Sequence, residues 1–219
     1  MSWFIRVSRY LSVHMIYAQE MPNSCGMASI MMVNFKQKRD TMMTGLAAGA
    51  QLNNLPLVGP AAGQALMKAA IDYAVKSEPE VYKEYTKVTG SPYDGSGYSD
   101  CLFFPKVLKN LGLGEWEAVY VGPTGFSAAA KAATAKAPII CQVRWANGAH
   151  FVVIDEYHFG DGMVNDPGDG ELHVTSMTDG NAVTYTPSEP LFSFSLGGKR
   201  GSYGPGQTGT FSGWIVRKK

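Results

Sequence analysis

The feature that most constrains the fold of this chain is a change in hydrophobic pattern near residue 137. From Ser24 to about Lys136, apolar residues recur at helical spacing in segments that Pro and Gly residues separate. From Pro138 onward, the segments are short and rich in β-branched and aromatic residues, which is typical of strands. Helices followed by antiparallel strands predict an α+β fold and not a repeated β–α–β arrangement.

The predicted elements can be read directly as segments of the sequence. The helical segments are CGMASIMMVNFKQ, TMMTGLAAGAQL, GQALMKAAIDYAVK, PEVYKEYTKV, SDCLFFPKVLKNLG and FSAAAKAATAKA. The strand segments are IICQVRW, HFVVIDEY, GMVND, ELHVTS, AVTYT and FSGWIVRK. Asn147-Gly148 predicts a hairpin between the first two strands, and the Gly-rich stretch 196–209 predicts a loop before the last one.

Composition and charge exclude several classes of protein. Of the 219 residues, 45% are hydrophobic and 11% are aromatic, which excludes a disordered chain. A net charge of +1 gives no overall field to attract nucleic acid, so we expect no nucleic-acid partner. No apolar stretch is long enough for a signal peptide or a membrane span. We therefore expect a cytoplasmic protein, or one that is secreted or delivered without a cleavable signal peptide.

The three cysteines differ in their surroundings. They are too few and too scattered for a disulfide framework or a zinc site, and Cys101 and Cys141 lie in apolar runs that predict packing roles. Cys25 follows Asn23 and Ser24, which are good N-cap residues, and it opens a helix that is apolar on nearly every side. Backbone N–H groups and the helix dipole favour a thiolate at such a position.

A nucleophilic cysteine needs a base, a group that orients the base, and donors for the developing oxyanion. His150 opens the strand segment HFVVIDEY and is the candidate general base and acid. Asp166 is the candidate orienting residue, and Gln19 is the candidate oxyanion donor beside the backbone N–H of Cys25. Asn165 is an alternative orienting residue, but adjacent strand residues face opposite sides, so only one of the two can point at His150.

The position of one turn decides whether this group can assemble. A tight turn at Asp161-Gly162 would place Asp166 about 23 Å along the strand from His150. A turn at Phe159-Gly160 places Asp166 opposite Val153, at an offset of about 10 Å that twist and side-chain length can largely close. We therefore predict the earlier turn.

Two segments that carry these residues resemble a known family. QEMPNSCGMAS resembles the nucleophile motif of papain-like cysteine peptidases, and GAHFVVIDEYHFGDGMVNDPGDG resembles their histidine motif. The interval from His150 to Asp166 and the Asp-Pro pair are similar to those of peptidase domains that process bacteriocin leaders. Both motifs also resemble the papain-like effector proteases that bacteria deliver into other cells. The resemblance implies a central helix packed on a small antiparallel sheet, with the active site between them and no metal or organic cofactor.

The resemblance also sets expectations for domain organisation and partners. It implies one papain-like catalytic domain over residues 1–219, with a mainly helical part over 1–136 and an antiparallel sheet over 137–219. The interval from Cys25 to His150 is longer than in the leader-processing domains, which predicts an insertion at about 41–120. The expected partner is a protein or peptide substrate. A bacterial effector or toxin would also meet an immunity or inhibitor protein, or a host protein.

Several functions remain open at this point. The leading hypothesis is hydrolysis of a peptide or isopeptide bond through an acyl-enzyme on Cys25. Deamidation or acyl transfer by the same residues is one alternative, and a catalytically silent peptide-binding module is another. The run DPGDGE at 166–171 lacks the ligand spacing of an EF-hand, so it indicates turns and not a metal site. Gly197-Gly198 is similar to double-glycine cleavage sites, which leaves self-processing open.

Overall fold

The computed structural model describes residues 3–54, 59–146, 148–187, 192–194 and 208–219. The helices are α1 (Cys25–Leu52), α2 (Gly59–Ala74), α3 (Glu78–Thr89), a 3-10 turn (Cys101–Phe103), α4 (Phe104–Asn110) and α5 (Phe126–Thr134). The strands are β1 (Trp3–Val7), β2 (Val13–Tyr17), β3 (Trp116–Tyr120), β4 (Ile139–Trp145), β5 (Gly148–His158), β6 (Asp161–Asp166), β7 (Glu171–Ser176), β8 (Thr184–Tyr185), β9 (Phe192–Phe194) and β10 (Gly209–Lys218). The predicted α+β class is confirmed.

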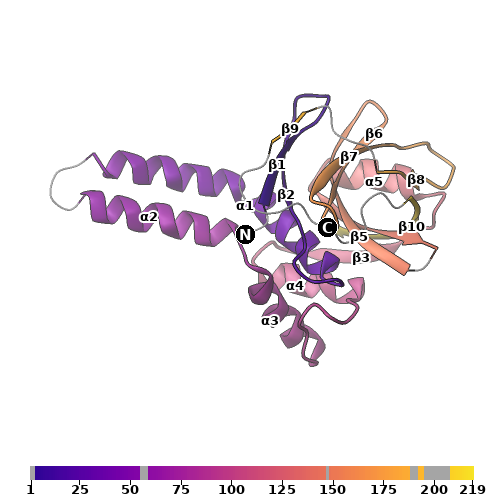
Figure 1. Cartoon of the computed structure of the whole chain (residues 1–219), viewed down its shortest axis with the longest axis horizontal. Coiled ribbons are helices and arrows are strands. Elements are labelled where there is room, and N and C mark those ends of the chain that lie inside the picture. The colour runs from indigo at the N-terminus through magenta and orange to yellow at the C-terminus, as the bar shows by residue number, and fades with distance from the viewer. Residues whose placement is uncertain (1–2, 55–58, 147, 188–191, 195–207) are drawn as a thin grey trace.

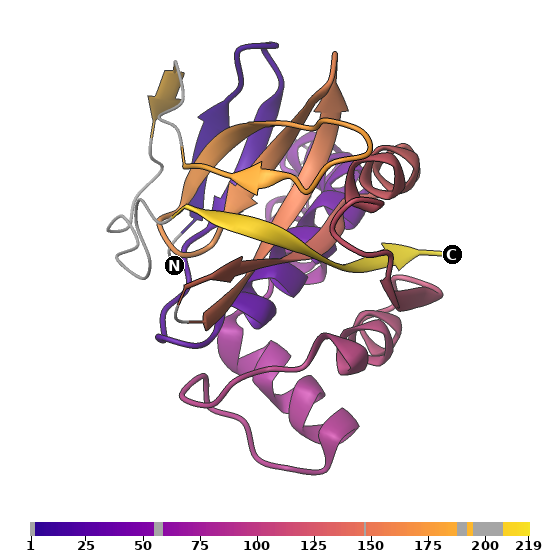
Figure 2. The same ribbon diagram turned by 90° about the vertical axis from the view of Figure 1, so that its right-hand side faces the viewer.

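The larger sheet is antiparallel and is covered by helices on both faces. Its strand order is β3-β10-β4-β5-β6-β7, and β8 pairs with β10. Alternate residues of β5 face different cores: Val153 lies in the core that contains Ile30 of α1, whereas Val152 lies in the core that contains Phe126 of α5. Figure 2 shows β10 in yellow as it crosses the sheet, with α1 behind it. The sheet therefore separates two apolar cores.

A smaller sheet has the order β2-β1-β9 and contains an N-terminal hairpin that the sequence did not predict. The strand pattern of β1 is interrupted by Arg6, whose guanidinium is buried and pairs with Glu171 at 2.5 Å. A buried charge breaks the alternation from which strands are recognised. β3 also lies inside the segment that we expected to be helical, so the larger sheet draws on both parts of the chain.

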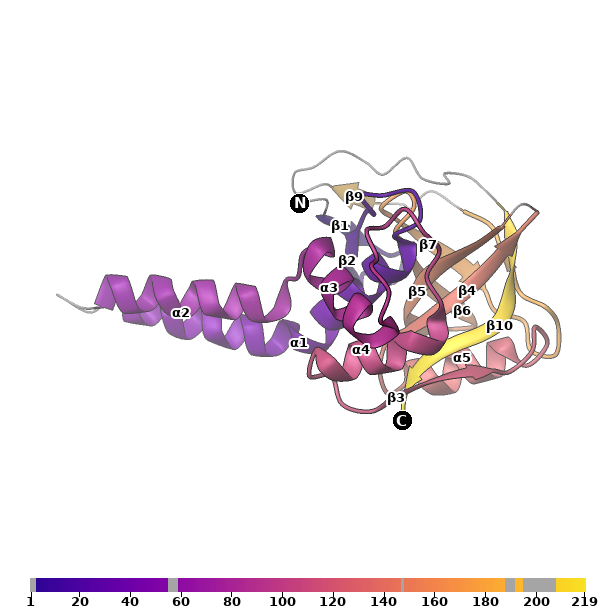
Figure 3. The same cartoon turned by 90° about the horizontal axis from the view of Figure 1, so that it is seen from below.

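The prediction of two separate helices over 25–52 is wrong. CGMASIMMVNFKQ and TMMTGLAAGAQL form the single helix α1, because no Pro or Gly stands between them to end the helix. α1 and α2 form a hairpin that projects from the body (Figure 1), and Figure 3 shows the same projection from below. The two helices approach closely, since a Cβ atom added to Gly49 would lie 2.8 Å from the carbonyl oxygen of Gly63.

The turn between β5 and β6 is the one that we predicted. His158 pairs with Asp161, so Phe159 and Gly160 form the turn, and their φ angles are 48° and 93°. A β-bulge between Ile154 and Glu156 then shifts the register by one residue. The predicted pairing of Asp166 with Val153 is therefore wrong, because Val153 pairs with Asn165.

This bulge matters for the predicted site. Residues that pair across an antiparallel ladder share a face, so a regular ladder would place Asp166 on the face opposite to His150. The extra residue moves Asp166 one position closer to His150 and onto the same face.

Three further predictions concern turns and membrane spans. β4 ends at Trp145 and β5 begins at Gly148, and these two residues pair, while Asn147 lies outside the described residues. Most of the predicted loop at 196–209, including Gly197-Gly198, also lies outside them. No described helix is long and apolar enough to cross a membrane.

Candidate active site

Cys25 lies at the N-terminus of α1, as predicted. The first half of this helix is buried, and Cys25 itself is 9% exposed and forms no disulfide. The Ser24 side chain makes no capping hydrogen bond; its hydroxyl oxygen accepts from the Met21 N–H, and its one hydrogen points between the Met21 carbonyl and Glu78. The first-turn N–H groups of α1 therefore keep their positive potential near the sulfur.

His150 and Asp166 are joined by a short hydrogen bond. His150 Nε2 lies 2.6 Å from Asp166 Oδ1, and the Gly168 N–H donates to the same oxygen at 2.7 Å. The Tyr185 hydroxyl donates to the other oxygen, Oδ2. The Trp145 ring stacks on the imidazole with ring centroids 4.8 Å apart and an interplanar angle of 18°. The plane and the orientation of the imidazole are thus fixed by its neighbours.

The structure also brings Cys25 close to His150, near enough for the Cys25 sulfur to help raise the pKa of the imidazole. Nε2 of His150 is bonded to Asp166, so Nδ1 is the ring nitrogen left to interact with the thiol. We call Cys25, His150 and Asp166 the Cys–His–Asp series.

The charges in this series favour an ion pair. Burial alone lowers the pKa of His150, but the Asp166 carboxylate and the Cys25 sulfur outweigh burial and hold this pKa above its ordinary value. Burial alone would raise the pKa of Asp166, yet His150 and the Tyr185 hydroxyl hold it below its ordinary value. A protonated His150 beside an ionised Asp166 is the state that can stabilise a thiolate.

Gln19 is buried in the loop that precedes α1. Its backbone N–H donates to the Pro167 carbonyl at 2.8 Å, which ties this loop to the one that follows Asp166. Its side-chain Nε2 donates to the carbonyl oxygens of Met21 at 2.8 Å and Pro22 at 3.0 Å. Both amide protons are thus engaged, so the predicted oxyanion role requires one of these bonds to be exchanged for the substrate.

Glu78 holds the same loop, and the sequence analysis did not identify it. It is 1% exposed and accepts hydrogen bonds from the Glu20 N–H at 2.8 Å, from Ser24 and from the Tyr82 hydroxyl. Burial, in part offset by these donors, raises the pKa of Glu78. The sequence around Glu78 does not predict its contacts with the loop before α1, because an acidic residue is common in the first turn of a helix.

The sequence predicted neither the contact of Tyr185 with Asp166 nor that of Trp145 with His150, although Trp145 was expected in the core or the lining of the cleft. The contact of Trp145 with His150 could have been predicted from the sequence. A tight hairpin that pairs Val143 with His150 places residue 145 diagonally across from the imidazole. Tyr185 lies on the short strand β8, and nothing in its sequence context predicts a contact with Asp166.

The carboxylates of the 166–171 run are paired with basic side chains. Asp169 accepts from His173 at 2.9 Å, and Glu171 accepts from Arg6. Ligand atoms of Asp166, Asp169 and His173 lie within 4.8 Å of one another, so these three could hold a metal ion. In this structure they serve instead as hydrogen-bond partners.

A cavity of about 260 Å³ lies between the 3-10 turn and the larger sheet. Its lining residues are Ser99, Asp100, Cys101, Leu102, Gln142, Phe151 and Trp214. Phe151 follows His150 in the chain, and Ser99 lies against Gly26, where an added Cβ would be 2.4 Å from the Ser99 hydroxyl oxygen. Ser99 thus places this cavity near the start of α1, whereas Phe151 and His150, as adjacent strand residues, point to opposite faces of the sheet.

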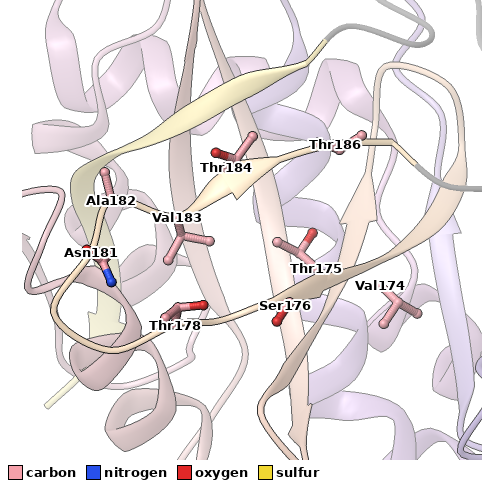
Figure 4. Close-up of a pocket in the computed structure, with 9 residues that line it drawn as sticks. All are labelled: Val174, Thr175, Ser176, Thr178, Asn181, Ala182, Val183, Thr184 and Thr186. Atoms are coloured by element: carbon pink, nitrogen blue, oxygen red, sulfur yellow. The ribbon is translucent and has the colours of Figure 1, made fainter.

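Another cavity, of about 430 Å³, is rich in hydroxyl groups (Figure 4). Thr175 and Ser176 line it from β7, and Thr184 lines it from β8. None of its lining residues belongs to the Cys–His–Asp series.

Comparison with known protein families and with curated proteins found no match for this chain. The chemistry of the site is therefore inferred from its geometry.

Proposed function

We propose that the protein is a papain-like cysteine peptidase that hydrolyses a peptide or isopeptide bond through an acyl-enzyme on Cys25. The observation that carries this proposal is the Cys–His–Asp series at the start of a buried helix. A central helix packed on an antiparallel sheet supports the papain-like arrangement. No other group is needed for the reaction, since the nucleophile, base and orienting residue all come from this chain.

Each residue has one task in this mechanism. His150 takes the proton of the Cys25 thiol, and the sulfur attacks the carbonyl carbon of the substrate. The backbone N–H of Cys25, together with a released N–H of Gln19, stabilises the oxyanion. His150 then gives its proton to the departing amine, and a water molecule hydrolyses the thioester. Asp166 keeps Nδ1 of His150 directed at the sulfur through its bond to Nε2.

The cavity beside Phe151 and Ser99 is the proposed site for a substrate side chain. It is lined by Ser99 and by the sheet residues Gln142 and Trp214, and Ser99 lies against Gly26, the residue after Cys25. The Asp100 carboxylate lines it and favours a basic or amide side chain there.

A catalytically silent peptide-binding module is the second candidate function. The observation that favours it is the engagement of both Gln19 amide protons with backbone carbonyls. Such a module would bind a peptide in the same cavity without forming a thioester.

The test is the alkylation of the native protein by iodoacetamide across pH, with each cysteine followed by peptide mass spectrometry. Cys25 is expected to react below pH 8 and faster than the two other cysteines, since burial raises the pKa of Cys101 to about 11 and also raises that of Cys141. The His150→Ala variant should lose this low-pH reactivity. Reactivity of Cys25 that ignores His150 would contradict the proposal.

A second measurement separates the remaining reactions. The protein and its Cys25→Ala control are incubated with a peptide library, and product masses are recorded. Two fragments show peptide hydrolysis, whereas a gain of about one dalton shows deamidation of a side-chain amide. Intact peptides with a reactive Cys25 would favour the silent module.

A further inference from the structure

The segment between Gln19 and Cys25 determines how the two proposed oxyanion donors lie relative to each other. One donor is the side-chain amide of Gln19, and the other is the backbone N–H of Cys25. Residues 20–24 separate them and lie outside helices and strands. Two N–H groups stabilise one oxygen atom only when both are held in position to point at it. A group that fixes residues 20–24 therefore affects the rate of any reaction that passes through an oxyanion.

One carboxylate oxygen contacts both ends of this segment. Glu78 Oε1 accepts the backbone N–H of Glu20 at 2.8 Å and lies 3.2 Å from the hydroxyl oxygen of Ser24. The Ser24 hydrogen is shared with the Met21 carbonyl oxygen, which is 3.0 Å away. The same carbonyl accepts from Gln19 Nε2 at 2.8 Å. Because Glu20 and Ser24 are the first and last residues of the segment, one oxygen atom of Glu78 joins its two ends.

The carboxylate of Glu78 is itself held in place. Glu78 is the first residue of α3, whose start is fixed by a capping box in which the Ser77 N–H donates to the Glu80 carboxylate at 2.8 Å. Val81, about one turn further on, is buried in the core that also contains the first half of α1. The other carboxylate oxygen, Oε2, accepts from the Tyr82 hydroxyl. Glu78 is 1% exposed, so water hardly competes for these bonds.

We propose that Glu78 is the positioning residue of the oxyanion site, because its Oε1 holds residues 20–24 so that Gln19 and the backbone N–H of Cys25 reach the same substrate oxygen. This inference rests on the proposed function, since it concerns the same acyl-enzyme reaction. Glu78 acts through the segment and is not itself a catalytic residue. An N–H of Gln19 can leave its backbone partner for the substrate while the segment stays in place, because Glu78 holds Glu20 and Ser24.

The test compares two reactions of Cys25 that differ in their need for an oxyanion. The sulfur displaces iodide from iodoacetamide at a saturated carbon, so no oxyanion forms. With p-nitrophenyl acetate, the sulfur attacks the carbonyl carbon through a tetrahedral oxyanion, p-nitrophenolate leaves, and an acetyl thioester remains on the sulfur. Release of p-nitrophenolate by the Cys25→Ala variant is subtracted as background. The ratio of the acylation rate to the alkylation rate then measures oxyanion stabilisation apart from thiolate reactivity.

Three variants of the full chain each change one side chain of α3. Glu78→Met removes both acceptor oxygens and is expected to lower the ratio about tenfold or more, since loss of one oxyanion donor slows such reactions about 100–1,000-fold. Glu78→Gln keeps one acceptor oxygen for Glu20 and Ser24, so its ratio should stay near that of the parent. Glu84→Met is the matched control and should leave the ratio unchanged, because Glu84 pairs with Lys87 at 2.6 Å on the same helix.

Two results in these variants would overturn the positioning role. An equal fall of both rates in Glu78→Met would show a purely structural effect, and an unchanged ratio would show no effect on the oxyanion. A loss in Glu78→Gln as large as that in Glu78→Met would overturn the assignment to the acceptor oxygen.

Ser24→Ala provides a second test that does not depend on the folding of Glu78→Met, which circular dichroism checks. It removes the contact with Glu78 at one end of the segment, so the ratio is expected to fall, and an unchanged ratio would contradict the proposal. The parent chain separates this proposal from the proposed function. Alkylation of Cys25 that ignores His150 would refute the peptidase and the positioning role together. Alkylation that depends on His150, with an unchanged ratio in Glu78→Met, would refute the role of Glu78 alone.

Discussion

The carboxylate of Asp166 is held from three sides. It accepts from His150 and Gly168 on Oδ1 and from Tyr185 on Oδ2, in a position that is 2% exposed. A buried carboxylate is stable only when such donors replace water. The orienting residue of the site is therefore itself oriented, and the Tyr185 hydroxyl is the part of this arrangement easiest to remove.

The Tyr185→Phe variant removes one donor and keeps the ring. We expect it to lower the free energy of unfolding by about 1–3 kcal/mol, because one buried oxygen of Asp166 loses its partner. Urea unfolding at pH 7 measures this change. Tyr120→Phe is the control, since Tyr120 is 55% exposed, and its free energy should stay within about 0.5 kcal/mol of the parent. An equal loss in both variants would contradict the special role of Tyr185.

Gly26 provides a second prediction at the scale of single residues. A Cβ atom there would lie 2.4 Å from the Ser99 hydroxyl oxygen and 2.5 Å from Cζ of buried Phe104. We expect Gly26→Ala to cost about 1–3 kcal/mol of stability through overpacking and to slow the alkylation of Cys25.

The control for this change is Gly97→Ala. A Cβ atom added at Gly97 meets nothing within 4 Å, so both stability and the alkylation rate should stay near those of the parent. Unchanged alkylation of Cys25 in Gly26→Ala would show that the start of α1 tolerates a side chain there.

The β5–β6 hairpin is the element on which the site most depends. Its turn sets the pairing of the two strands, and its bulge moves Asp166 onto the face of His150. The turn contains Phe159, a bulky residue with φ at 48°, in a conformation that favours Asn or Gly. The hairpin that brings Asp166 to His150 therefore carries backbone strain at its turn.

Replacing this residue should relieve the strain. We expect Phe159→Asn to raise the free energy of unfolding by about 1 kcal/mol, because Asn tolerates the left-handed region and Asn-Gly suits this turn. Thermal unfolding measures the gain. Tyr98→Asn removes another exposed aromatic residue at a position without positive φ, so it should give no gain. A loss of stability in Phe159→Asn would show that the Phe159 ring contributes more than its backbone costs.

The β5–β6 hairpin contains both features that the sequence predicts and features that it does not. The strands and the turn at Phe159-Gly160 were predictable, because hydrophobic alternation and turn chemistry are local properties. The contact of His150 with Asp166 was expected from the residue types, although the regular register predicted with this turn would have placed the two on opposite faces. The bulge at Asp155 was not, since it depends on a side chain whose partners come from β2 and α1. The N-terminal hairpin was missed for a similar reason, because its buried Arg6 is stable only beside the distant Glu171.

For the whole molecule, the pairing of histidines with carboxylates is a recurring feature. All four histidines lie within 2.9 Å of a carboxylate oxygen: His14 with Asp155, His150 with Asp166, His158 with Glu156 and His173 with Asp169. Three of these pairs include a histidine that is at most 4% exposed. Folding stability is therefore linked to pH.

The direction of this linkage follows from the folded-state pKa values. The pKa of His150 is raised, so its contribution is fully present below its ordinary value of 6.5 and is lost as pH rises through the folded-state pKa. The pKa values of Asp155 and Asp166 are lowered, so their contributions are present above the ordinary value of 3.8 and are lost as pH falls. We expect maximal stability between these two values.

Urea unfolding at pH 5.5 and at pH 8.5 tests this expectation, and the midpoint should be higher at pH 5.5. The His150→Asn variant should lose much of the difference, because the group that releases its proton is gone. A midpoint that rises from pH 5.5 to pH 8.5 in the parent would contradict the assigned direction.

β10 lies between β3 and β4, so the larger sheet can be completed only after the last residues of β10 have been synthesised. Among the described strands, β3 has no other neighbour in the sheet, and β4 must leave one edge open until residues 209–218 arrive. During synthesis, Cys25 is therefore made first, His150 later, and β10, which joins β3 to β4, last of these. Assembly of the sheet depends on contacts between distant segments, which form slowly. A chain still being synthesised therefore carries Cys25, His150 and Asp166 before it has the strand that completes the sheet.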